Sequence, residues 1–108
     1  MQDDLASTVR WYAANAAHLR SFEDQEEVMA MFILRDVIAD RLKSQELTSE
    51  YQEKLAQADA IVADLRYWLV GTHPDVFHPD RKTTVPHEHW WWYLDEGPQV
   101  RAKALEAA

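Results

Sequence analysis

The chain has 108 residues, a formal net charge of -8 and no cysteine. This length suits a single domain that buries a hydrophobic core without covalent crosslinks. The lack of cysteine excludes disulfides, thiolate nucleophiles and cysteine-ligated zinc sites, and it is compatible with a reducing compartment. The negative charge disfavours binding to nucleic acid and to anionic lipid surfaces.

Neither a membrane span nor an export signal is visible in the sequence. The longest wholly apolar run covers residues 28–34 and is far shorter than the roughly 20 residues that a membrane helix needs. Residues 1–4 carry two acidic side chains, whereas a secretory signal begins with basic ones. We therefore expect a cytoplasmic protein with no membrane partner.

Apolar residues recur at alternating steps of four and three in three segments, a spacing typical of helices that bury one face. The three segments are residues 4–19, 22–43 and 48–71. Ser21 is expected to cap the second helix, and Gly71 is expected to stop the third. Because short connections make consecutive helices antiparallel neighbours, the sequence predicts an all-α protein with an antiparallel three-helix bundle as the core, over residues 1–71.

Residues 72–108 belong to the same predicted domain but differ in composition. Three prolines interrupt any helix between residues 72 and 86 and indicate a Pro/His-rich loop. Residues 87–96 can form a short helix that ends at Gly97, and Pro98 is well placed to begin a last helix. We expect one or two short C-terminal helices after the loop.

The sequence shows no catalytic motif. The two glycines, Gly71 and Gly97, are too few and too far apart for a phosphate-binding loop, and no Gly-x-Ser-x-Gly pattern occurs. The serines lie where helix ends are expected, which favours capping over nucleophilic catalysis. We assign no catalytic residue and favour a non-enzymatic role.

Four of the five histidines gather between residues 73 and 89, namely His73, His78, His87 and His89. Imidazole and carboxylate groups are common ligands of divalent metals. His87 and His89 project to one side only if the chain is extended there, because in a helix they point about 200° apart. We expect no cofactor, and the alternative is a divalent metal held by these histidines in a metal-binding protein or metal-dependent enzyme.

The most unusual feature is the run of aromatic residues at Trp90, Trp91, Trp92 and Tyr93. Adjacent side chains point in different directions in a helix or a strand, so three indoles cannot all face one core. We therefore expect at least one indole to be partly exposed. Either the block caps the bundle, with two rings inward and one over loop residues, or it anchors a partner.

Two further apolar stripes lie away from the main seams. Met29, Ile33 and Val37 follow one another at steps of four, and Trp11 and Phe22 lie off the first seam. Three helices alone leave these surfaces in water, so either the aromatic block or another chain covers them. The sequence therefore predicts a helical protein-interaction module that acts as an adaptor, inhibitor or regulatory subunit, binding another protein or forming a homodimer.

Overall fold

The computed structural model describes residues 4–107, which form helices and connecting turns with no strand among them. Residues 1–3, part of the N-terminal segment considered above, lie outside this description. The α-helices are α1 (Leu5–Ala17), α2 (Gln25–Arg41), α3 (Ser49–Asp64), α4 (Arg66–Thr72) and α5 (Val100–Ala107). The 3-10 helices are η1 (Leu19–Ser21), η2 (Pro74–Phe77), η3 (Pro79–Arg81) and η4 (Trp90–Glu96). The prediction of an all-α protein is confirmed for the described residues.

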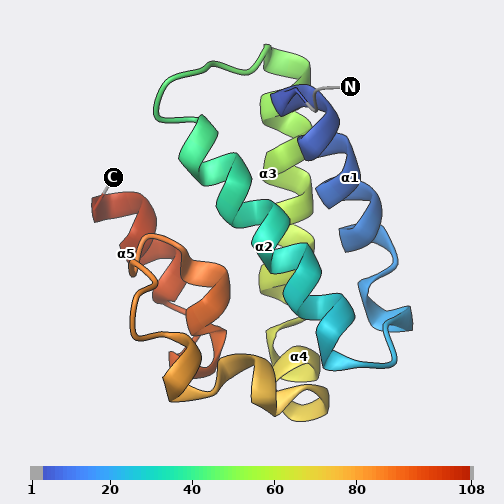
Figure 1. Ribbon diagram of the computed structural model, residues 1–108, viewed down its shortest axis with the longest axis vertical. Coiled ribbons are helices and arrows are strands. Elements are labelled where there is room, and N and C mark those ends of the chain that lie inside the picture. The colour runs from blue at the N-terminus through green and yellow to red at the C-terminus, as the bar shows by residue number, and fades with distance from the viewer. Residues whose placement is uncertain (1–3, 108) are drawn as a thin grey trace.

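The first three long helices meet around α1, which packs against both α2 and α3. In Figure 1, α1 and α3 run side by side, and α2 crosses in front of α3. After α3 the chain turns through α4 at the lower end and returns on the side of α2 away from α1, where α5 lies (Figure 1). The C-terminal segment is therefore positioned to cover one flank of α2.

The first two α-helices begin at side-chain caps, whereas α3 and α4 have no side-chain cap hydrogen bond. Asp4 accepts a hydrogen bond from the Ser7 amide at 2.7 Å and so caps α1. Asp24 caps α2 by accepting from the Glu27 amide at 3.0 Å. Ser21 lies in η1 instead, so the prediction that it caps the second helix is wrong. The extra turn of η1 after α1 shifts the start of the second helix to Gln25.

The predicted third helix is divided at Leu65, whose backbone (φ -90°, ψ 13°) ends α3 and precedes α4. The divided helix still buries Leu69 completely. Gly71 lies inside α4, so the expectation that it stops the helix is wrong. The helix ends at Thr72, with His73 as its C-cap, because Pro74 disfavours helical backbone in the residue that precedes it.

The predicted loop is more ordered than its composition indicated. Two of its prolines begin η2 and η3, where the missing amide hydrogen costs nothing. Val76 and Phe77 are buried and join the same hydrophobic core as the long helices. Gly97 ends η4 as expected, with φ at 135°, a conformation that favours glycine. The core therefore continues well beyond residue 71.

Among residues 4–107, no helix is long and apolar enough to cross a membrane.

Candidate functional site

One carboxylate of α2, that of Asp36, holds the aromatic block in place. It accepts hydrogen bonds from Trp91 Nε1 at 3.0 Å and from Trp92 Nε1 at 2.9 Å, and His89 Nδ1 lies 2.8 Å from it. Since an ionised carboxylate only accepts, Nδ1 of His89 carries the proton in this pair. Asp36 thus satisfies two indole donors that burial would otherwise leave without a partner.

A second polar group, formed around Arg35, joins three helices inside the fold. Its guanidinium donates to both oxygens of Asp59, from Nε at 2.9 Å and from Nη2 at 3.0 Å. The Tyr12 hydroxyl donates to the same carboxylate at 2.7 Å, and Arg35 stacks over the Trp91 ring at 4.4 Å. Burial, and secondarily the Asp59 charge, raises the pKa of Tyr12 well above its ordinary value. The contacts tie α1, α2 and α3 to the aromatic block.

The aromatic block itself is internal. Trp90, Trp91 and Trp92 are 3%, 1% and 5% exposed, and Tyr93 is also buried. The expectation that at least one indole is partly exposed is therefore wrong. The reason is that several elements surround the block: Phe32 of α2 packs edge-on against Trp92, and η4 also contacts α3, α4, α5 and η2. In this fold, none of these four aromatic residues is accessible to a partner.

The four histidines between residues 73 and 89 have separate surroundings. Nε2 of His73 lies 3.2 Å from the Phe22 carbonyl, and Nδ1 of His78 accepts from the Asp80 amide. His87 stacks on Tyr93, while His89 is held by Asp36 as described above. Within the part of the chain that the structure describes, no group of three or more His, Cys, Asp or Glu is placed to hold a metal ion. The structure does not bring the predicted metal ligands together.

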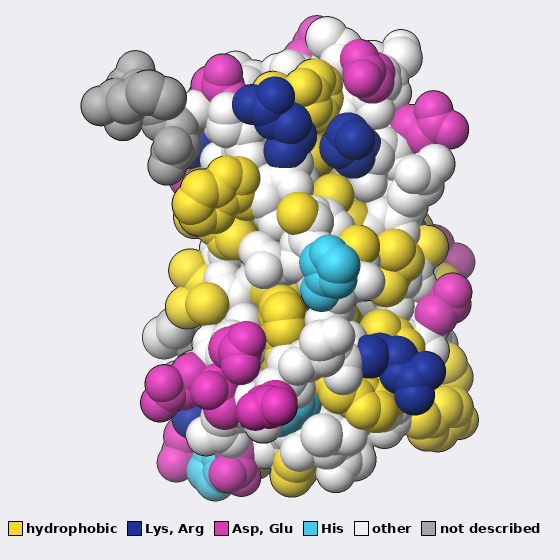
Figure 2. Space-filling view, turned by 90° about the vertical axis from the view of Figure 1, so that its right-hand side faces the viewer, with side chains coloured by type: hydrophobic (Ala, Val, Ile, Leu, Met, Phe, Trp, Pro, Cys, Tyr) yellow, Lys and Arg dark blue, Asp and Glu magenta, His cyan; other side chains and the backbone are white. Residues whose placement is uncertain are grey.

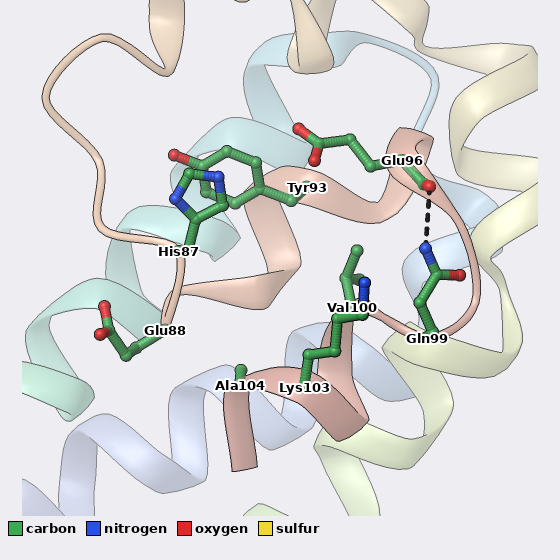
Figure 3. Close-up of a pocket in the computed structure, with 8 residues that line it drawn as sticks. All are labelled: His87, Glu88, Tyr93, Glu96, Gln99, Val100, Lys103 and Ala104. Atoms are coloured by element: carbon green, nitrogen blue, oxygen red, sulfur yellow. Dashed lines mark hydrogen bonds between the residues drawn. The ribbon is translucent and has the colours of Figure 1, made fainter. Parts of the chain in front are cut away.

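A cavity of about 310 Å³ lies between η4, α5 and the turn before η4 (Figure 3). The stacked rings of His87 and Tyr93 form one wall, and Val100 lines the α5 side. The Tyr93 hydroxyl donates to the Val85 carbonyl and is therefore not available as a catalytic acid. Burial raises the pKa of Tyr93, with smaller contributions from nearby glutamates. No nucleophile and base are paired in this cavity.

The outer side of α1 and α2 is different, because large apolar side chains there face solvent. Trp11 is 68% exposed and Ile33 is 52% exposed. Trp11 lines a shallow hollow together with Leu34, which places the two side chains side by side. We call the five residues of this surface the outer patch, and they are Trp11, Ala30, Ile33, Leu34 and Val37.

The residues of the outer patch differ in part from those of the predicted stripes. Met29 and Phe22 are only partly buried, and they pack against the core. Ala30 and Leu34 take part in their place, since they lie on the same side of α2 as Ile33. Figure 2 shows the side on which α1 lies, where hydrophobic side chains form separate groups and acidic ones gather near the lower end.

Comparison with protein-family models, with curated proteins and with solved structures finds no significant match to this chain.

Sequence reasoning missed Arg35, Asp36 and Asp59. A signal was present for two of them. Arg35 lies within the apolar arc of α2, and Asp59 lies within the apolar seam of α3, next to Ala58. Charged residues in such positions are almost never buried unless they are paired. The sequence therefore held evidence for a buried ion pair, although not for which helices it joins.

Proposed function

We propose that this chain is a non-enzymatic protein-interaction module that presents the outer patch to a protein partner. The finer fold prediction is part of this proposal: an antiparallel three-helix bundle, closed by the Pro/His-rich segment, supports the binding surface. Adaptor, inhibitor and regulatory-subunit roles all fit such a module. The net charge of -8 disfavours nucleic acid and anionic membranes as partners.

The observation that carries the proposal is the exposure of Trp11 and Ile33 on adjacent helices. The sequence left two candidates to cover the extra apolar stripes, the aromatic block and another chain. The aromatic block lies against Asp36 and Phe32 on the inner side of α2. The turn before it borders Val37, but Trp11 and Ile33 remain exposed. Large apolar side chains exposed on neighbouring helices are a common feature of interaction sites.

The inner contacts also favour this role because they fix the backbone of α2. Arg35 is bound to α3 and Asp36 to the aromatic block. Both residues lie within three positions of Ile33. A surface held rigid before binding loses less conformational entropy when a partner docks.

A photo-crosslinking side chain placed at Ile33 tests the proposal in the cells that make the protein. We expect one discrete protein adduct from position 33, with this chain itself counted among the candidate partners. The matched control carries the same side chain at Gln57, an exposed position on α3, and it should give no such adduct. The proposal is wrong if neither position crosslinks, or if both give the same mixture of products.

A further inference from the structure

A groove of about 670 Å³ lies between α3, α5 and the segment that joins α2 to α3. In Figure 1, α5 and this segment lie on the same side of α2. Four leucines give the groove apolar walls: Leu105 is 65% exposed and Leu42 is 37% exposed, whereas Leu47 and Leu55 are buried. The volume lies within the range of roughly 300–1,000 Å³ that is typical of small-molecule sites.

One cation that lines the groove, Arg101 of α5, has no acceptor for its guanidinium. Arg101 is partly buried, and its guanidinium lies 5.3 Å from the centre of the Trp90 ring. Among residues 4–107, no hydrogen bond or ion pair joins this guanidinium to another side chain or to the backbone. By contrast, Arg35 donates to Asp59, and Arg66 donates to a backbone carbonyl. A partly buried guanidinium without an acceptor favours the binding of an anion.

The two acidic residues that line the groove do not compensate the charge of Arg101. The carboxylate of Asp59 is neutralised by Arg35, which donates to both of its oxygens, and it also accepts from the Tyr12 hydroxyl. Glu46 is exposed on the connecting segment, where solvent screens its charge. Neither carboxylate forms an ion pair with Arg101. The groove therefore combines an aliphatic surface with one cation that lacks a counter-ion.

We infer that this groove binds the anion of a free fatty acid, with the carboxylate on Arg101 and the aliphatic chain along the leucines. No aromatic side chain is among the described residues that line the groove, so the lining suits an aliphatic chain better than a flat ring system, which gains from stacking. The net charge of -8 disfavours the surface of an anionic membrane as the source of the ligand. The inference does not depend on the proposed function, because the groove and the outer patch share no residue.

Calorimetric titration of the full chain with decanoate, at concentrations at which decanoate forms no micelles, tests the site. We expect one molecule to bind per chain. Arg101→Gln should weaken decanoate binding about tenfold, because it removes a charge-assisted hydrogen bond, and should leave the binding of neutral 1-decanol unchanged. Leu105→Gln should weaken the binding of both probes. Arg20→Gln, which changes an exposed arginine outside the groove, is the matched control and should bind both probes as wild type does.

NMR spectra recorded with and without decanoate locate the bound chain. Signals of Leu42, Leu55 and Leu105 should shift, while those of Ile33 on the outer patch should not. Equal decanoate affinity of wild type and Arg101→Gln, or shifts centred on Ile33, would contradict the inference. Binding to vesicles of phosphatidylcholine and phosphatidylglycerol without binding of decanoate would also contradict it, because the ligand would then be a lipid surface.

Discussion

The inner and outer faces of α2 differ in how far their side chains are buried. On the inner face, Phe32, Arg35 and Asp36 each have partners from another helix or from the aromatic block. On the outer face, Ile33 is 52% exposed although it is next to Phe32, which is fully buried. The comparison shows that the C-terminal segment covers one side of the helix and leaves Ile33, on the other side, exposed to solvent.

The two faces should therefore respond differently to mutation. Changes on the inner face remove contacts within one chain, so they should lower the free energy of unfolding of the monomer. Changes on the outer face should leave the monomer stable and alter association. Four substitutions or sets of substitutions test this difference, from the largest expected loss of stability to the smallest.

Asp59→Ala should cause the largest loss, about 3–5 kcal/mol in the free energy of unfolding, because it leaves the Arg35 guanidinium buried without its counter-ion. Among residues 4–107, Nη1 of Arg35 has no hydrogen-bond partner, so the loss of Asp59 leaves more of the guanidinium donors unsatisfied. Urea denaturation followed by circular dichroism gives the value. Gln57→Ala on the same helix is the control and should change stability by less than about 0.5 kcal/mol. A loss at Asp59 as small as that of the control would show that the ion pair does not support the inner face.

Replacing each of Trp90, Trp91 and Trp92 by alanine in turn should lower stability by about 3–5 kcal/mol. All three rings are buried, so each substitution removes packing and opens a cavity. Thermal unfolding of the three variants beside wild type provides the comparison. If one variant had wild-type stability, its ring would lie on an accessible surface. The aromatic block would then again be a candidate binding site.

Tyr12→Phe should lower stability by about 1.5–3 kcal/mol at pH 7, because the hydroxyl donates to the charged carboxylate of Asp59. Folding raises the pKa of Tyr12 above the ordinary 10.0, so the folded chain holds the phenol proton more tightly than the unfolded chain does. The stability linked to this proton is fully present below pH 10 and is lost as pH rises toward the raised pKa. Urea denaturation at pH 8, 10 and 11 should show a steeper decline for wild type than for Tyr12→Phe. Equal declines would contradict the buried phenol.

The sequence predicted the regions whose packing is set by short-range periodicity. All five residues of the first predicted seam are buried, namely Leu5, Val9, Tyr12, Ala16 and Leu19. Leu42 departs from its seam and is 37% exposed, because α2 ends at Arg41.

The hydrogen bonds of Asp36 could not be predicted from the local spacing of apolar residues. Its three partners lie 53 to 56 positions further along the chain, and no local spacing reports a contact at that distance. The same limit applies to the exposure of the indoles. Whether three adjacent aromatic rings are all buried depends on how many elements surround them, and the position of α5 is not encoded in the spacing of the block itself.

Light scattering on the purified protein, wild type beside Ile33→Glu, tests most directly whether a second copy covers the outer face of α2. If a second copy is the partner, wild type has twice the 12.6 kDa of one chain at high concentration. Ile33→Glu should have the mass of one chain with unchanged helicity and a change in stability below about 0.5 kcal/mol, while Gln57→Glu, the control, should remain dimeric. A wild-type mass of 12.6 kDa at every concentration would contradict a second copy as the partner of the outer patch.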